Sequence, residues 1–525
     1  MTRTTQRWSG ALIATLLAIL LSLSTISPAL AAPDQRDDFA LGRYVDSGDF
    51  GDWSSVLTQS LGILALHRAS GMAPSDAAVD LLLAQQCDDG SFPDAFRAPS
   101  TSDPAPCSGG VDTTAFAVQA LDAIGEDDAV AAATGWLVSA QDGDGSFGGE
   151  DGLNSTSTGL AALALAIGGH DAEAAQARDW VLALQDACDT DTPGAIPFRP
   201  GDSDDDRGVE VMSTSQALLG LAGPGLAYLD AGTASGADPV TGCDDDPSGD
   251  FGDAAEAAAT YLLSELADGS HLVVQDFPSD GATIDVLFAL AAVEQGGNTI
   301  DTIFAWLSDR AAGYTQGAGF DADDAAYAGA TAKLALAAIV AGQDPRGVGG
   351  IDLIAQLEAR ETTELPEVTL SCEVEEAAPG DEVSCTIAGL LGGETVDVLV
   401  ELDATLLDEA VTADSSGSAA FVFTVPEDAT EEDEATITVA GLGVEALADL
   451  GVAIAATPVS DEPDETDDTE DVEETDPVDE ATDDQDVLPE TGDQLSLAAG
   501  MGVASLLFGL VLVAVSRRRR EVEHA

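Results

Sequence analysis

Apolar residues recur at helical spacing along most of the first 360 residues, in runs separated by short polar turns. Runs such as AVAAATGWLVSAQ and NSTSTGLAALALAIGG carry apolar side chains at every third or fourth position, which indicates helices. The runs alternate between two series, so the pattern predicts six helical hairpins. One series covers residues 53–70, 111–124, 154–168, 210–222, 281–295 and 324–341, and the other covers 75–86, 127–141, 171–185, 254–266, 299–312 and 350–360.

A hairpin of this size cannot bury its apolar side chains alone, so each one must pack against its neighbours. Six hairpins can close into a ring in which one helix of each pair lies inside and the other outside. Alanine fills the apolar runs, as in AALALAIGG and AEAAATYLL, and its small side chain allows helices to approach closely. We therefore predict an all-α toroid of six helical pairs, (α/α)6, over residues 39–361.

The period changes to two from Pro366 onward. The segments VTLSCEV, DEVSCTI, TVDVLVEL, SAAFVFTVP and EATITVAG alternate apolar and polar residues, and turns rich in Gly, Pro and Ser separate them. This pattern predicts a small all-β sandwich of immunoglobulin-like type over residues 365–455. Residues 456–487 then form an acidic stretch without a basic residue, in which self-repulsion favours an extended, disordered linker.

Both ends of the chain carry long apolar runs. Residues 1–31 combine two arginines, an apolar run and the small residues Ala29-Leu30-Ala31, which is the pattern of a cleaved secretory signal peptide. Residues 495–516 are long and apolar enough for a transmembrane helix, and the basic tail 517–525 places its end in the cytoplasm.

A short motif, residues 488–492, precedes this apolar span. It consists of Leu488, Pro489, Glu490, Thr491 and Gly492. The order LPETG, apolar span, basic tail resembles the LPXTG sorting signal of Gram-positive surface proteins. The resemblance implies sortase as a partner, cleavage after Thr491 and a covalent link from Thr491 to peptidoglycan, so that the membrane helix holds only the precursor. An ordinary C-terminal membrane anchor with a chance pentapeptide is the alternative.

The formal net charge of -80 comes from 97 acidic and 17 basic residues, and Lys333 is the only lysine in the chain. Nucleic acids and anionic membrane surfaces are poor partners for such a surface. Six cysteines in an exported chain indicate disulfides rather than metal thiolates. Spacing suggests the pairs Cys87–Cys107, Cys188–Cys243 and Cys372–Cys385, although six cysteines allow fifteen connectivities.

One turn sequence occurs twice in the chain. Gln86-Cys-Asp-Asp-Gly-Ser-Phe92 returns as Gln141-Asp-Gly-Asp-Gly-Ser-Phe147, and both turns follow a predicted helix. With the helix starts Val111-Asp-Thr-Thr and Asn154-Ser-Thr-Ser, these turns resemble the repeats of the prenyltransferase and squalene oxidase family, whose fold is an α/α toroid. In that family the turn ties an outer helix to the next inner helix. Later turns, at Gly194–Phe198 and Gly317–Phe320, keep less of the pattern.

The same resemblance suggests catalytic candidates, because terpene cyclases of this family protonate an olefin with an Asp-x-Asp-Asp motif. Asp321, Asp323 and Asp324 match that motif. A simple helix N-cap is the alternative role for Asp324. Only 5% of the residues are aromatic, whereas a carbocation needs aromatic faces around it. No zinc-ligand spacing occurs among the four histidines, and the thioester motif Cys-Gly-Glu-Gln is absent.

Two further sets of carboxylates stand out. Asp112, Asp285 and Asp324, with Tyr327, lie at or near predicted inner-helix starts, where they would form a rim for a ligand or a pair of glycosidase carboxylates. Asp142 and Asp144, and Asp202 and Asp204, alternate along loops as calcium ligands do, but both loops lack the glycine and glutamate of an EF-hand. We expect no cofactor, with calcium as the one candidate and solvated acidic turns as the alternative.

Together these patterns predict a secreted, cell-wall-anchored protein that displays the toroid as a ligand-binding or adhesive module without catalysis. Its ligand would be a small molecule, a glycan or a protein. The alternative is a surface enzyme, either terpene-cyclase-like or glycan-hydrolysing, that uses the rim carboxylates.

Overall fold

The structure is a computed structural model that describes residues 39–48, 52–98, 107–149, 152–201, 207–239, 243, 251, 253–274, 277–319, 321–322, 324–374, 376–402, 404–414, 417–429, 434–441, 444–447 and 452–454. The predicted signal peptide, acidic linker, LPETG motif, membrane helix and basic tail lie outside these ranges. Within them, the structure has no helix that is both long enough and apolar enough to cross a membrane.

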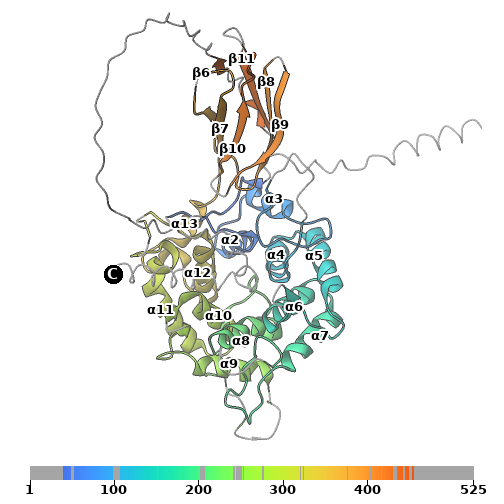
Figure 1. Ribbon diagram of the computed structural model, residues 1–525. Helices are drawn as coiled ribbons and strands as arrows, with labels where there is room; N and C mark the ends of the chain where they lie inside the picture. The colour runs from blue at the N-terminus through green and yellow to red at the C-terminus, as the bar shows by residue number, and fades with distance from the viewer. Residues whose placement is uncertain are drawn as a thin grey trace, which may run out of the picture.

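Twelve α-helices in the described ranges form a closed ring with two layers (Figure 1). The inner helices are α2 (Val56–Arg68), α4 (Val111–Ile124), α6 (Ser155–Ile167), α8 (Arg207–Ala222), α10 (Asp280–Ala292) and α12 (Ala328–Val340). The outer helices are α3 (Asp76–Ala84), α5 (Asp127–Ala140), α7 (Asp171–Leu182), α9 (Ala254–Ser264), α11 (Gly297–Gln316) and α13 (Leu353–Glu358). Each inner helix contacts the next, and α12 contacts α2, so the ring closes as the apolar periodicity predicts.

The inner helices are buried on every side rather than on one stripe. In α10 every residue from Gly281 to Ala292 is buried, and in α6 every residue from Ser155 to Leu165 is buried. Small residues bring neighbouring inner helices together: a Cβ added at Gly159 of α6 would lie 2.6 Å from the Cα of Ala217 in α8. The alanine-rich sequence therefore serves close helix packing, and the described inner helices show no broad solvent-facing side.

Residues 39–48 close the ring by joining its first and last hairpins. The Gly42 N–H donates to Thr362 O, and the Thr362 N–H donates to Arg43 O, at 2.8 Å each. Further along this segment, the Ala328 N–H donates to the Asp46 carboxylate at 2.7 Å. This contact marks the start of α12, which begins at Ala328 rather than at residue 324 as the sequence pattern predicts.

The repeated turn connects one outer helix to the next outer helix through its glutamine side chain. The Gln86 side chain, after α3, donates to Gly90 O in its own turn and to Ala129 O in α5, at 3.0 Å each. Gln141 donates in the same way to Gly145 O and to Glu173 O in α7. Each glutamine amide therefore links one outer helix to the next outer helix.

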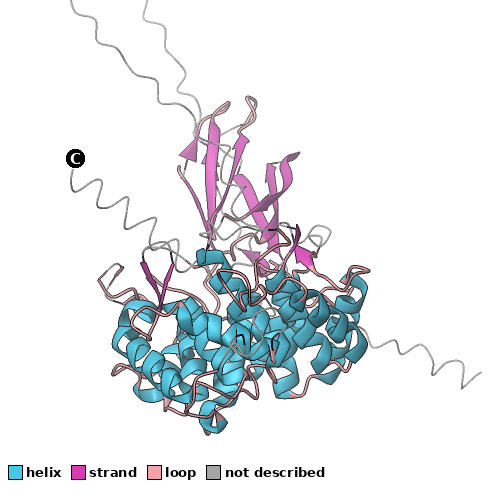
Figure 2. Ribbon diagram, turned by 90° about the horizontal axis from the view of Figure 1, so that it is seen from below, coloured by secondary structure: helices cyan, strands magenta, loops and turns pink. Residues whose placement is uncertain are grey.

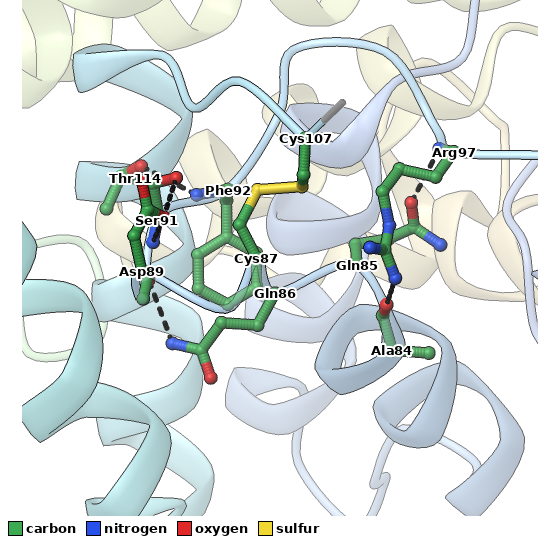
Figure 3. The surroundings of a disulfide bond; sticks show 11 residues. Ala84, Gln85, Gln86, Cys87, Asp89, Ser91, Phe92, Arg97, Cys107 and Thr114 are labelled. Atoms are coloured by element: carbon green, nitrogen blue, oxygen red, sulfur yellow. Dashed lines mark hydrogen bonds between the residues drawn. A yellow bond between two sulfur atoms is a disulfide. The ribbon is translucent and has the colours of Figure 1, made fainter. Parts of the chain in front are cut away.

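The aromatic residue of the turn provides the link to the inner layer. The Phe92 N–H donates to Thr114 Oγ1 of α4 at 3.0 Å (Figure 3). In the same way, the Phe147 N–H donates to Thr158 Oγ1 of α6 at 3.0 Å. Both phenylalanine side chains are fully buried. Gly145 has φ of 97°, and a Cβ there would lie 2.5 Å from Gln176 O of α7, so this position requires glycine.

The third turn keeps this joint although its sequence differs. Gln185 donates to Gly194 O and to Ala254 O of α9, and the Ile196 N–H donates to Thr214 Oγ1 of α8. Ile196 therefore takes the aromatic position, and the joint is kept although the turn keeps less of the sequence pattern. Backbone groups make most of these contacts, so the side chain at this position can change.

Three disulfides use all six cysteines. Cys87 pairs with Cys107, Cys188 with Cys243 and Cys372 with Cys385, which confirms the connectivity that spacing suggests. The first bond crosses the loop that follows the turn at Gln86 (Figure 3).

The strands form two small hairpins beside the ring and a separate β domain (Figure 2). The hairpins are β1 (Gly148–Gly149) with β2 (Gly152–Leu153), and β3 (Leu272–Val274) with β4 (Phe277–Ser279). The β domain contains β5 (Thr369–Cys372), β6 (Glu376–Ala377), β7 (Glu382–Ala388), β8 (Thr395–Leu402), β9 (Ala404–Thr412), β10 (Ala419–Thr424), β11 (Glu434–Gly441), β12 (Val444–Leu447) and β13 (Val452–Ile454).

Two sheets make up the β domain. One has the order β10-β7-β5, the other has the order β6-β13-β11-β8-β9, and β12 pairs with β11. Apolar and polar residues alternate in burial along β8 and β10, as the period of two predicts. The inward-facing residues, including Val398, Phe421 and Ile437, form one core that is distinct from the core of the ring.

Candidate functional site

The two ends of the ring differ because the inner helices all run in the same direction. An outer helix returns the chain between successive inner helices, so the six inner N-termini lie at one end of the ring. At the other end, the segment after α8 (residues 223–230) crosses toward α2 and α4. Arg68 of α2 donates to Leu226 O and Leu229 O at 2.6 Å each, and the Leu226 N–H donates to Gln119 of α4 at 2.9 Å.

This crossing segment covers the C-terminal end of the ring. Leu226 and Leu229 are 2% and 1% exposed and belong to the main core. At the other end of the ring, Asp112 lies in the first turn of α4.

A buried ion pair joins two inner helices. Lys333 Nζ of α12 lies 2.7 Å from Asp285 Oδ1 of α10, and the side chains are 10% and 7% exposed. Gln216 Nε2 of α8 lies 3.5 Å from Asp285 Oδ2. The only lysine in the chain thus lies in the ring interior, in a group of polar side chains that spans three adjacent inner helices.

Two carboxylates of the predicted acid motif, Asp321 and Asp324, are not buried. The Asp321 carboxylate accepts a hydrogen bond from the Tyr327 hydroxyl at 2.6 Å. Asp324 is exposed, and Asp323 lies outside the described residues. Asp324 does not cap α12 either, because Tyr327 occupies the N-cap position and the Asp46 carboxylate accepts from the first helical N–H. The N-cap hypothesis for Asp324 is therefore wrong, since the ring-closing segment already supplies this group.

Asp112, in the first turn of α4, is the most perturbed carboxyl of the predicted rim. Burial raises its pKa to about 6, and the charge of Asp94 adds to this, while a hydrogen bond from the Ser157 hydroxyl lowers the pKa. The buried Oδ1 of Asp112 has no hydrogen-bond partner among the described residues. Asp112, Asp285 and Asp324 thus have separate surroundings, namely Ser157, Lys333 and solvent.

Asp46 is a second buried carboxyl, which sequence patterns do not reveal. It is 6% exposed, and burial raises its pKa to about 6. Backbone N–H groups of Ala328 and Trp53 and the charge of Arg43 lower the pKa, whereas the charge of Asp52 raises it. Asp46 therefore stabilises the start of α12 while it carries a buried charge at neutral pH.

The raised pKa values of Asp46 and Asp112 predict that the folded protein is more stable at mildly acidic pH than at neutral pH. Both have a folded-state pKa near 6, above the ordinary value of 3.8, so the folded state binds protons more tightly than the unfolded state. Stability therefore rises as pH falls from 7.5 to 5, by roughly 2 kcal/mol for the pair. Urea unfolding at both pH values should show this gain, and the Asp46→Asn/Asp112→Asn variant should lose it. An identical gain in that variant would contradict the assignment.

The calcium candidates act as turn residues where the structure describes them. Asp144 accepts hydrogen bonds from the N–H and the hydroxyl of Ser146, at 3.1 and 2.5 Å, and these bonds lower its pKa. Within the described ranges, no three His, Cys, Asp or Glu side chains gather as a metal site. Asp142 belongs to the same turn, and Asp202 and Asp204 lie outside the described residues.

Comparison with known proteins finds similar chains among the solved structures. No protein-family model matches the sequence, and no curated protein matches it. This chain is similar to a solved structure of the type II terpene cyclase MstE from Scytonema. That structure is of a variant in which alanine replaces an arginine, in complex with the substrate geranylgeranyl dihydroxybenzoate. The TM-score is 0.34 and the sequence identity is 14%, and the match covers 63% of this chain and 96% of that chain.

Proposed function

We propose that this chain is an exported protein, anchored to the cell wall through Thr491, that displays the helical ring as a non-catalytic ligand-binding or adhesive module. The order of signal peptide, LPETG motif, apolar span and basic tail supports the export and anchoring. The three disulfides add support, because disulfides form and persist outside the reducing cytoplasm. Sortase and peptidoglycan are the partners that this proposal requires.

The state of the acid motif carries the non-catalytic part of the proposal. A carboxyl that protonates an olefin must be shielded from water and keep its proton until the substrate is in place. Asp324 is exposed, and Asp321 is occupied by the Tyr327 hydroxyl. Neither of these two carboxyls has the surroundings that such an acid needs.

The burial of the inner helices suggests where a ligand would bind. Because α6 and α10 are covered on nearly all sides, the inner layer offers little surface to a large ligand. Binding would fall to the outer helices and the rim loops, where carboxylates are frequent. A protein or glycan that docks on this surface would need to tolerate or match a strongly negative charge.

The β domain would then serve as a spacer of immunoglobulin-like type. Its strands follow each other between two sheets in the order expected for such a sandwich, with β5, β7 and β10 facing β8, β9, β11 and β13. Its disulfide lies within one sheet, between β5 and β7, whereas antibody domains link their two sheets.

Asp112 is the observation that favours an enzyme instead. A carboxyl with a pKa of about 6 and a buried oxygen that has no hydrogen-bond partner among the described residues has the properties of a general acid. The terpene-cyclase-like and glycan-hydrolysing alternatives would have to use this residue in place of Asp324.

Turnover assays distinguish the non-catalytic module from the terpene-cyclase-like and glycan-hydrolysing alternatives. We expect the purified chain to convert neither polyprenyl diphosphates nor cell-wall glycans, because Asp324 is exposed and the Asp321 carboxylate accepts a hydrogen bond from the Tyr327 hydroxyl. Asp112→Asn removes the candidate general acid, and Asp324→Asn, at an exposed position, is the control. Turnover that disappears in Asp112→Asn and persists in Asp324→Asn would overturn the non-catalytic proposal.

A further inference from the structure

An exposed tryptophan lies just before the first inner helix, at the end of the ring where the inner helices begin. Trp53 is 53% exposed, and α2 starts shortly after it, at Val56. Among the tryptophan, tyrosine and phenylalanine side chains that the structure describes, Tyr228 is the other exposed one, at 57%. Tyr228 belongs to the segment that crosses the opposite end of the ring, so each end carries one exposed aromatic side chain.

The loop that carries Trp53 is held on both sides of this residue. Asp52 Oδ1 accepts from the N–H groups of Asp46 and Ser54, at 3.1 and 2.9 Å, and Asp52 Oδ2 accepts from Arg43 at 2.8 Å. Arg43 also donates to Ser54 Oγ at 3.1 Å. Because these contacts already order the backbone, covering the exposed indole with a ligand costs little conformational entropy.

A second loop lies beside this one and adds polar groups. Arg43 Cζ lies 4.4 Å from the centre of the Phe96 ring, so the guanidinium that holds the Trp53 loop also contacts the second loop. The carbonyl oxygen of Asp94 accepts from the first N–H of α2 at 3.4 Å. The exposed Asp94 also accepts a hydrogen bond from the Thr113 hydroxyl through its carboxylate. The two loops therefore place carboxylates next to an exposed aromatic side chain.

A sugar fits these groups better than a protein surface does. A pyranose has a face of C–H groups, which can cover an indole, and a rim of hydroxyls, which can donate hydrogen bonds to carboxylates. A protein interface instead needs a core of several apolar side chains. The other exposed large apolar side chains of the described residues, which lie outside these two loops, are Leu182, Tyr228, Val273, Val374 and Val422. The net charge of -80 repels anionic ligands and thus favours a neutral glycan.

We propose that the end of the ring where the inner helices begin binds a neutral glycan, with Trp53 as the platform on which one sugar ring stacks. Asp52 and Asp94 accept hydrogen bonds from the sugar hydroxyls, and Arg43 keeps the two loops together. This inference rests on the proposed function, because it names the ligand class of the binding module.

Calorimetric titration of the purified chain with chitohexaose and with mannohexaose tests the site. We expect at least one of these neutral sugars to bind with a Kd below about 1 mM. Chitohexaose binding would assign the site to N-acetylhexosamine chains of the cell-wall type, and mannohexaose binding to hexose chains of another surface. An anionic heparin hexasaccharide should not bind. Absence of binding to both neutral sugars, or tighter binding of heparin, would overturn the proposal.

Two alanine variants locate the site. Trp53→Ala should weaken sugar binding at least about tenfold, because a tryptophan at the centre of a contact carries much of its binding energy. Tyr228→Ala removes the exposed aromatic side chain at the other end of the ring and should leave the Kd unchanged. Both side chains are exposed, so both variants should stay folded, which circular dichroism checks. Equal losses in the two variants would overturn the role of Trp53.

The glycan site and the anchoring can fail separately. A protein that binds neither neutral sugar but is linked to peptidoglycan through Thr491 would refute the glycan site and keep the anchoring. A protein that binds a neutral sugar through Trp53 but is not attached to the wall would refute the anchoring and keep the glycan site.

Discussion

Lys333→Met should destabilise the protein by about 3–5 kcal/mol, because it leaves the Asp285 carboxylate buried without its cation. The two side chains are 10% and 7% exposed and lie 2.7 Å apart, so water can replace the ammonium only in part. The second variant, Lys333→Met/Asp285→Asn, removes both charges and should recover most of the loss. Urea unfolding of the three proteins measures these differences.

A surface ion pair provides the matched control. Arg310 Nε lies 2.7 Å from Asp280 Oδ1, with side chains that are 41% and 13% exposed. Arg310→Met should therefore cost no more than about 1 kcal/mol. If Lys333→Met lowers the free energy of unfolding no more than Arg310→Met does, the ion pair in the ring interior does not stabilise the fold as proposed.

Phe147→Ala should cost about 3–5 kcal/mol, because it removes a large side chain from a site with no room to collapse. The side chain is fully buried, and its backbone holds the joint between the turn and Thr158 of α6. The loss should reduce the cooperativity of the ring, since each hairpin is stable only against its neighbours. Thermal unfolding followed by circular dichroism is the measurement.

Trp53→Ala is the control for this prediction. Trp53 is 53% exposed, so removing its ring should change stability by less than about 1 kcal/mol. Equal losses in Phe147→Ala and Trp53→Ala would show that the turn is not a structural joint of the ring.

Local patterns predicted most of the helical layer. Apolar spacing located all twelve helices in the right order, because helix formation and amphipathic burial depend on residues three and four apart. The start of α12 was missed because it depends on Asp46, which lies 282 residues away in the sequence. The threonines that accept from the turns, such as Thr114 and Thr158, had a signal in the sequence, since each lies four residues into an inner helix.

The candidate site was harder to predict, because it depends on which side chains meet in the folded ring rather than on local sequence motifs. Asp285 was placed on the rim, but its pairing with Lys333 joins two helices that are 48 residues apart, and no local spacing reveals it. The acid motif had the right residue types, but Asp324 is exposed and Asp321 is only partly buried. In a chain with 97 acidic residues, burial distinguishes a functional carboxylate from a solvated one better than spacing does.

Anchoring to the wall is the central claim, and the chemical form of the C-terminus tests it most directly. Cell walls are digested with a muramidase, and the C-terminal peptide of the protein is identified by mass spectrometry. The account predicts a peptide that ends at Thr491 and carries a peptidoglycan fragment on its carboxyl group. A C-terminal peptide that continues through Gly492 to Ala525 would contradict it.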